Sequence, residues 1–230
     1  MNLDSLTPAD LAPYIQHTKI QANATRDEMI LHINQAAQHG FNAAMIPGSW
    51  VPLAVEILRG TQVKVASALD FPTVGVTTSA GKAFEAAELV RLGAEEIDIG
   101  VQIGWLKSGM FTEFRDDIAG VVKASGVPIK VMLELPLLDE KEREIAVELS
   151  MEAGVAYLKN ASSGQIETAN PTSVRYLADR VKNGVKVKAS GSIKSFAQVK
   201  SLIQAGAALV GTSAGIEIIT DSSNSKTESY

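Results

Sequence analysis

The chain has 230 residues, of which 46% are hydrophobic and 20% charged, and it contains three histidines and no cysteine. A chain of this length can bury a sizeable core, and the missing cysteine excludes disulfides, thiolate nucleophiles and cysteine-based zinc sites. The net charge of −5 argues against a nucleic-acid partner, and no apolar run reaches the roughly 18 residues of a membrane span. Acidic residues near the N-terminus do not fit a signal peptide, so we expect a cytoplasmic protein.

Short β-rich runs alternate with helical patterns along almost the whole chain. After a short helix at residues 3–12, we expect strands at residues 14–19, 41–46, 63–69, 95–101, 129–135, 155–160, 185–190 and 207–213. The helical patterns between them cover residues 25–39, 51–59, 77–92, 112–124, 140–153, 172–182 and 196–205. Thr25 has the sequence context of a helix N-cap, and Gly40 and Gly93 follow helical runs, where a left-handed residue ends a helix.

This alternation predicts the fold class. Parallel strands need a helical crossover between them, and eight such units close into a (β/α)8 TIM barrel, with the helix at residues 3–12 across its bottom. An open doubly wound sheet is the alternative, but no GxGxxG motif follows any strand. We expect residues 1–220 to form one barrel domain and residues 221–230, which lack aliphatic side chains, to form a flexible polar tail.

Charged side chains are expected inside this barrel, near the carboxyl ends of its strands, where active sites of this fold lie. Strict alternation puts Asp98, Lys159 and Lys188 on the inner faces of their strands. Thr18 points inward if His17 does not, and the sequence leaves that choice open. A lower layer of Glu96, Lys130 and Lys186 is interpreted as a structural ion-pair set.

The two lysines suggest a particular chemistry. Neighbouring strands lie about 4.8 Å apart, so the ammonium groups of Lys159 and Lys188 disfavour each other's charge. A neutral amine attacks carbonyl carbon and forms a Schiff base, for which Asp98 offers a counter-charge and a proton relay. The alternative is a pair of ordinary rim lysines with their heads in water, paired to Asp98 or Glu134.

At these residues the chain resembles the deoxyribose-phosphate aldolases, which are class I, Schiff-base-forming aldolases. The matching stretches are IQHTKIQANAT at 15–25, residues 68–109, IKVMLELPLL at 129–138, AGVAYLKNASSG at 153–164, VKVKASGSI at 185–193 and AGAALVGTSAG at 205–215. The resemblance implies reversible cleavage of 2-deoxy-D-ribose 5-phosphate to glyceraldehyde 3-phosphate and acetaldehyde. It also implies that the covalent intermediate needs no metal or other cofactor.

The resemblance assigns roles to individual residues. Lys159 is the imine-forming lysine, Lys188 keeps that amine reactive, and Asp98 relays protons. The ending SNSKTESY is similar to a family tail whose terminal tyrosine enters the site, which would give Tyr230 a proton-shuttling role; plain disorder is the alternative. The substrate-binding residues that the resemblance implies are Thr18, Ser163, Gly164, Gly191, Ser192, Gly211 and Ser213.

Several positions depart from the family pattern. Gln16 stands where the family has an aspartate, which weakens the carboxylate network around Asp98 and Lys188. Ser163 and Ser192 stand at glycine positions of the phosphate-binding loops.

These departures leave two alternatives open. One is a related lysine-imine aldolase that acts on a different, possibly non-phosphorylated, aldehyde or keto substrate. The other is a non-catalytic barrel used as a binding protein. The expected partner is a small-molecule phosphosugar or aldehyde, and the resemblance suggests a possible homodimer.

Overall fold

Eight parallel strands form one closed barrel in the computed structural model, which describes residues 5–72 and 74–220. The strands are β1 (Ile15–Thr18), β2 (Ala43–Pro47), β3 (Lys64–Leu69), β4 (Glu96–Gly100), β5 (Ile129–Met132), β6 (Tyr157–Lys159), β7 (Lys186–Ser190) and β8 (Leu209–Thr212). Each strand pairs with the next one in the chain, and β8 closes the ring on β1. The expected (β/α)8 barrel is therefore confirmed.

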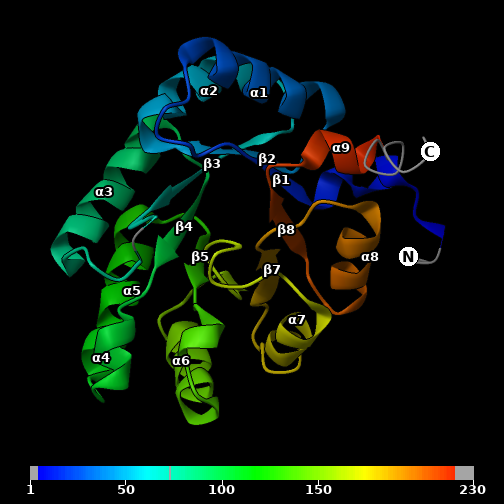
Figure 1. Cartoon of the computed structure of the whole chain (residues 1–230). Helices are drawn as coiled ribbons and strands as arrows, with labels where there is room; N and C mark the ends of the chain where they lie inside the picture. Colours follow the sequence, from blue (N-terminus) through cyan, green and yellow to red (C-terminus); the bar gives the residue numbers. More distant parts are fainter. Residues whose placement is uncertain (1–4, 73, 221–230) are drawn as a thin grey trace.

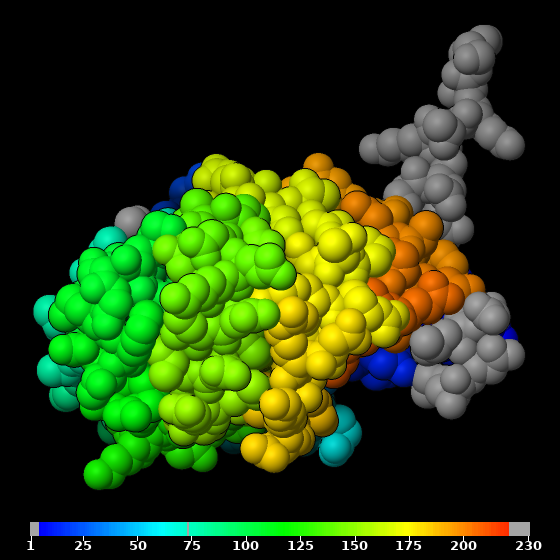
Figure 2. Space-filling view, turned by 90° about the horizontal axis from the view of Figure 1, so that it is seen from below, coloured from blue at the N-terminus to red at the C-terminus, as the bar shows by residue number. Residues whose placement is uncertain are grey.

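Helices lie outside the ring of strands and follow the chain around it (Figure 1). They are α1 (Arg26–His39), α2 (Val51–Leu58), α3 (Ser79–Leu92), α4 (Ile103–Lys107), α5 (Phe111–Ser125), α6 (Glu140–Glu152), α7 (Pro171–Ala178), α8 (Phe196–Gln204) and α9 (Gly215–Ile219). Short 3-10 helices are η2 (Pro8–Tyr14), η3 (Gly48–Trp50) and η4 (Leu135–Leu137). Figure 2 shows this layer as a continuous surface from α5 and α6, in green, to α8, in orange.

Local sequence signals fix the ends of these elements. The side chain of Thr25 accepts a hydrogen bond from the backbone N–H of Glu28, as expected for the N-cap of α1. Gly40 ends α1 with φ of 64°, and Gly93 ends α3 with φ of 110°. The helix ends predicted at these two glycines are therefore confirmed. No helix of the described residues is long and apolar enough to cross a membrane.

The N-terminal segment differs from the expectation of a helix at residues 3–12. The described part is the 3-10 helix η2, which runs from Pro8 to Tyr14 and packs against α8 and α9 in the outer layer. Pro13 has no backbone N–H to donate to an α-helical ladder, which explains why this stretch stays short and of the 3-10 type. The expected tail at residues 221–230 lies outside the described residues.

Two kinds of packing hold the barrel and create its site. Outward-facing strand residues such as Ile97, Ile99 and Val131 belong to the large apolar core between strands and helices. Inside the ring, a small apolar cluster forms around Ala43, Met45 and Ala66, and Met132 of β5 is also buried there beside the cavity. Charged side chains occupy other parts of the interior and lie below the carboxyl ends of the strands.

Candidate active site

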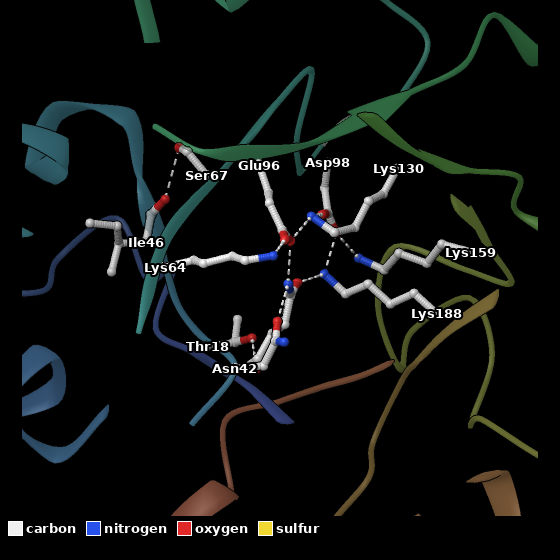
Figure 3. A network of polar contacts seen from close by, with 11 residues as sticks. Thr18, Asn42, Ile46, Lys64, Ser67, Glu96, Asp98, Lys130, Lys159 and Lys188 are labelled. Carbon is white, nitrogen blue, oxygen red and sulfur yellow. Dashed lines mark hydrogen bonds and ion pairs between the residues drawn. The ribbon is translucent and has the colours of Figure 1, made fainter. Parts of the chain in front are cut away.

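Strand register brings the charged side chains of four neighbouring strands together inside the barrel. Asp98 on β4 is level with Lys130 on β5, and Lys159 on β6 is level with Lys188 on β7. Figure 3 shows that the head groups of Lys130, Lys159 and Lys188 converge on Glu96 and Asp98. The inward orientation that alternation predicts for these residues is the one the structure has.

Asp98 is the centre of this cluster. Its Oδ2 accepts hydrogen bonds from Lys188 Nζ at 2.6 Å and from Lys159 Nζ at 3.0 Å, while Lys130 Nζ lies 3.4 Å from Oδ1. Burial alone would raise the pKa of Asp98, which is 1% exposed. The charges of the three lysines outweigh burial and hold the pKa of Asp98 well below its usual range. The carboxylate therefore carries its charge at neutral pH.

Lys188 is held from two sides and is 1% exposed. Besides its bond to Asp98, its Nζ donates to Gln16 Oε1 at 2.6 Å. Burial lowers the pKa of Lys188 to about 7, and the positive charges of Lys159 and Lys130 act in the same direction. The pairing with Asp98 opposes this shift without cancelling it. The centre therefore holds an amine that gives up its proton near neutral pH.

Lys159 has a more open position than Lys188. It is 6% exposed, borders the cavity described below, and its Nζ donates to Asp98. The alternative of rim lysines is right about the pairing with Asp98 but wrong about the water, since the side chains of Lys159 and Lys188 are only 8% and 1% exposed.

The lower layer of the barrel differs from the expected set of Glu96, Lys130 and Lys186. Glu96 pairs with Lys130 Nζ at 2.8 Å and with Lys64 from β3. Lys186 is exposed at the start of β7, so it does not pair with Glu96 as the alternation pattern predicts. Lys64 is the second lysine of the lower layer instead. Strand periodicity predicts which side of a strand a residue faces, but which partner it meets depends on the stagger between strands.

The open choice on β1 is settled by ring stacking. The ring of His17 stacks on His32 of α1, with centroids 4.1 Å apart, and also on Phe41. His17 therefore points outward into the helix layer. Its neighbours Gln16 and Thr18 share the opposite, inner face, and Thr18 borders the cavity.

A cavity of about 540 Å³ opens above this cluster at the carboxyl ends of the strands. Asp98, Lys159 and Lys188 contribute to its lining. The other sequence-predicted residues that border it are Thr18, Ser163, Gly164, Gly191, Ser192, Gly211 and Ser213. Tyr230 lies outside the described residues.

The loops after β6 and β7 meet closely at one wall of the cavity. A Cβ atom on Gly164 would lie 1.9 Å from Ser192 Oγ, so the serine side chain occupies the space beside this glycine. Ser192 has φ of 49°, in the left-handed region that a non-glycine residue adopts only at a cost in conformational energy. Gly164 is required here by the close approach of Ser192.

Buried polar side chains hold these loops in place. Glu134, which follows β5, accepts a hydrogen bond from the backbone N–H of Ser162 at 2.9 Å. Asn160, which follows β6, donates to the carbonyl of Ser190 at 3.0 Å and accepts from its N–H at 2.9 Å. Burial raises the pKa of Glu134. These contacts fix the loops relative to Lys159, the last residue of β6.

The sequence analysis missed several features of the site. The lining also includes Phe71, Lys194 and Glu217, and α9 follows β8 directly beside the cavity. A helix of five residues is too short to show a periodic pattern. The family resemblance already placed Gln16 near Asp98 and Lys188, whereas strand parity gives this contact only once His17 is known to point outward. No group of three or more His, Asp or Glu side chains suited to a metal occurs in residues 5–72 and 74–220.

Comparisons with known proteins place the chain in a family. No protein-family profile matches it. A deoxyribose-phosphate aldolase of Thermosynechococcus vestitus is 40% identical over 210 residues, which cover 91% of this chain and 96% of that protein. One of Methanothermobacter thermautotrophicus is 40% identical over 220 residues, covering 95% and 97%.

A solved structure extends this likeness to three dimensions. The deoxyribose phosphate aldolase of Aeropyrum pernix, described as tetrameric, superposes with a TM-score of 0.86 at 29% identity, covering 96% of this chain and 94% of that one. Identity near 40% over nearly the full length of the two relatives is sufficient to show the family. This chain belongs to the deoxyribose-phosphate aldolase family.

Proposed function

We propose that the protein cleaves 2-deoxy-D-ribose 5-phosphate reversibly to glyceraldehyde 3-phosphate and acetaldehyde through a Schiff base on Lys159. The observation that carries the proposal is the pair of lysines that donate to one oxygen of a buried carboxylate, at the floor of a cavity. An amine that is unprotonated near pH 7 can attack an aldehyde carbon, whereas an ammonium group cannot. Family membership supports the choice of this reaction.

The contacts favour Lys159 over Lys188 as the nucleophile. Lys188 Nζ has two acceptors, Asp98 and Gln16, both at 2.6 Å, and its side chain is almost fully enclosed. Lys159 Nζ has its bond to Asp98 at 3.0 Å and more contact with the open cavity. Because both lysines share Asp98 Oδ2, a proton that leaves one amine can be held by the other. Lys188 then acts as the proton reservoir and Lys159 as the attacking amine.

The reaction follows from this division of roles. The open-chain aldehyde condenses with the Lys159 amine and loses water, which gives an iminium ion. Loss of the C3 hydroxyl proton to the Asp98–Lys188 pair breaks the C2–C3 bond, releases glyceraldehyde 3-phosphate and moves the bonding electrons into an enamine. The same pair returns a proton to the enamine carbon, directly or through water. Hydrolysis of the resulting iminium releases acetaldehyde and restores the amine. A proton-shuttling role for Tyr230 stays a prediction.

The wall formed by the loops after β6, β7 and β8 is suited to the phosphate end of the substrate. Gly164, Gly191, Ser192, Gly211 and Ser213 border the cavity there. Their backbone N–H groups and serine hydroxyls are donors of the kind that barrels present to phosphate after the last two strands. Ser163 keeps a backbone N–H at its position, so replacement of a glycine does not remove a donor.

Two further properties stay predictions for this chain. The family resemblance suggests a homodimer or a monomer, and the Aeropyrum pernix relative is described as tetrameric. A cytoplasmic location also stays a prediction.

Turnover of 2-deoxyribose 5-phosphate by the purified protein tests the proposal. We expect release of glyceraldehyde 3-phosphate, measured with a coupled dehydrogenase, and its loss in Lys159→Leu. Lys186→Gln is the matched control, because Lys186 is an exposed lysine at the opposite end of β7 from the cavity; we expect it to leave turnover unchanged. Full activity of Lys159→Leu, or no activity of the parent protein on this substrate, contradicts the proposal. A panel with unphosphorylated 2-deoxyribose shows whether the phosphate is required.

A further inference from the structure

The segment between β3 and α3 folds over the end of β4 at the mouth of the barrel. A Cβ atom on Gly100, the last residue of β4, would lie 2.8 Å from Asp70 Oδ2 and 2.9 Å from the Asp70 carbonyl oxygen. Gly75 is equally close to the strand end, since a Cβ there would lie 2.4 Å from the carbonyl oxygen of Val101. Gly100 follows Asp98 by two residues on the same face of β4. The segment therefore lies next to the charged cluster, on its carboxyl side.

The side chain of Asp70 fastens this segment. Asp70 is the first residue after β3, and its Oδ2 accepts from the backbone N–H of Gly75 at 2.9 Å. Its Oδ1 accepts from the N–H of Val76 at 3.3 Å, and from the N–H of Thr77 at 3.1 Å and its hydroxyl at 2.7 Å. One carboxylate thus binds four donors that lie five to seven residues further along the chain.

A buried lysine ties the same carboxylate to the rest of the barrel. Lys82 Nζ on α3 lies 3.7 Å from Asp70 Oδ2 and donates to the carbonyl of Gly100 at 3.2 Å. It also pairs with Asp117 of α5. The side chains of these three charged residues are fully enclosed. Because enclosed charges are stable only with partners of this kind, the cluster fixes Asp70 relative to β4, α3 and α5.

The backbone of Asp70 is strained. Its φ is 53°, in the left-handed region that glycine adopts without cost and other residues adopt only when their surroundings hold them there. Strained residues of this kind cluster at functional sites. A glycine at this position would relieve the strain, but it could not bind the four donors. The chain therefore accepts strain here in exchange for a fixed segment.

The residue that Asp70 holds in place is its neighbour Phe71, which borders the cavity. β3 and β7 are four strands apart in the ring of eight, so Phe71 and Ser192 lie on opposite sides of the cavity. The side of Ser192 is rich in serine and glycine and is the one suited to phosphate. The side of Phe71 is apolar, and its other lining residues are Ile20, Met45, Ala68 and Met132.

We propose that Asp70 is a positioning residue that holds Phe71 against the uncharged carbonyl end of the aldehyde, across the cavity from the phosphate end. The Asp70 side chain is fully enclosed, so it acts through its neighbour and not by touching the substrate. The inference rests on the proposed function in what Phe71 contacts. The fastening of the segment by Asp70 is independent of the substrate.

Asp70→Gly tests the fastening while keeping the backbone conformation allowed. We expect the amide hydrogens of residues 75–77, followed by hydrogen exchange and mass spectrometry, to exchange about tenfold faster or more, because their acceptor is gone. Asp10→Gly is the matched control. Asp10 also accepts from the N–H and the hydroxyl of a threonine, Thr7, but it is exposed on η2. Unchanged exchange in Asp70→Gly overturns the inference whatever the protein's substrate is.

Asp70→Asn keeps the test decisive if Asp70→Gly does not fold. The neighbours of Asp70 present donors to both of its oxygens, whereas an amide has one accepting end. With the amide oxygen on Thr77, the NH₂ group would face the N–H of Gly75 and the ammonium group of Lys82. We expect exchange at Gly75 to be faster in this variant, with a smaller effect at Thr77.

A pair of variants tests whether Asp70 acts through Phe71. Asp70→Gly and Phe71→Ala should each lower kcat/KM for 2-deoxyribose 5-phosphate about tenfold, the effect of losing a small apolar contact. The double variant should be no worse than Phe71→Ala, because no ring is left to position. Independent structural losses would instead multiply, to about a hundredfold, and would overturn the inference.

Acetaldehyde separates the two ends of the substrate, since it has the carbonyl end and no phosphate. Phe71→Ala should slow the ethylation of Lys159 by acetaldehyde and cyanoborohydride; a loss confined to the phosphosugar would contradict the inference. If the parent protein neither cleaves the phosphosugar nor forms an adduct on Lys159, the proposed function fails, and the role of Phe71 fails with it. Faster exchange in Asp70→Gly would still establish the fastening by Asp70 in that case.

Discussion

Replacing Asp98 by asparagine removes the one charge that both reactive lysines share while keeping the shape of the side chain. Asp98 Oδ2 accepts from Lys188 and Lys159, and Lys130 lies 3.4 Å from the other oxygen. Breaking a buried ion pair by removing one partner typically costs about 3–5 kcal/mol of unfolding free energy. We expect Asp98→Asn to lose about that amount at pH 7. General acid–base catalysis contributes about 10²–10⁴-fold, so kcat/KM should fall by a factor in this range.

The loss of stability in this variant should depend on pH in a definite direction. Without the carboxylate, the buried lysines of the native state hold their protons less strongly, whereas lysines of the unfolded chain keep theirs until about pH 10. In both proteins the native state binds fewer protons than the unfolded state, since the pKa of Lys188 is about 7 already in the parent, so both gain stability between about pH 7 and 10. The variant gains more, because its native state has lost the carboxylate that favours protonated amines. The stability difference from the parent protein should therefore narrow on going from pH 7 to pH 9.5.

Urea unfolding at both pH values measures this difference. Asp116→Asn is the control, because Asp116 is an exposed carboxylate paired with Arg115 on the surface; a surface substitution of this kind usually changes stability by less than about 0.5 kcal/mol. A loss in Asp98→Asn that is below 1 kcal/mol at pH 7, or equally large at pH 9.5, would refute the reasoning.

Other predictions follow from single contacts. Gly164→Ala should raise KM for the phosphosugar, because a Cβ there would lie 1.9 Å from Ser192 Oγ. In the double variant Gly164→Ala with Ser192→Gly, the same kinetic assay should show KM falling part of the way back to the value of the parent protein. Ser192→Gly alone should gain about 1 kcal/mol in denaturant unfolding, since it relieves a left-handed backbone; no gain would show that this backbone is not strained. In the parent protein, kcat/KM should fall as pH drops below about 7, where Lys188 becomes protonated; a flat profile from pH 8 to pH 5.5 would exclude this amine from the rate. Lys82→Met should cost about 3–5 kcal/mol of stability, since it leaves the buried carboxylate of Asp117 unpaired, and a loss under 1 kcal/mol in urea unfolding would contradict that.

Much of the fold could be predicted because the relevant signals are local. The alternation of short apolar strands with amphipathic helices follows from side-chain periodicity, and helix ends follow from residues such as Gly40 and Gly93. The inward orientation of Asp98, Lys159 and Lys188 needed no more than strand parity. What periodicity cannot supply is the stagger between strands, and this is why the lower layer contains Lys64 and not Lys186.

The rest of the site depends on contacts between segments far apart in the chain. Gln16 and Lys188 are 172 positions apart, and only the closure of the barrel between β8 and β1 brings them together. The close approach of Ser192 to Gly164 likewise arises from the packing of two loops. The five-residue helix α9 has too few turns for a sequence pattern. Contacts of this kind could not be predicted from local sequence patterns, because they form only when distant segments pack together in the closed barrel.

Reductive trapping with acetaldehyde tests the central claim most directly. The protein is incubated with acetaldehyde and borohydride at pH 7.5, and the product is analysed by intact mass and peptide mapping. The account predicts a single ethyl group on Lys159 and its loss in Lys159→Leu, with the other lysines unmodified under the same conditions. No adduct, or ethylation scattered over exposed lysines with none on Lys159, would contradict the claim that this barrel holds an activated amine.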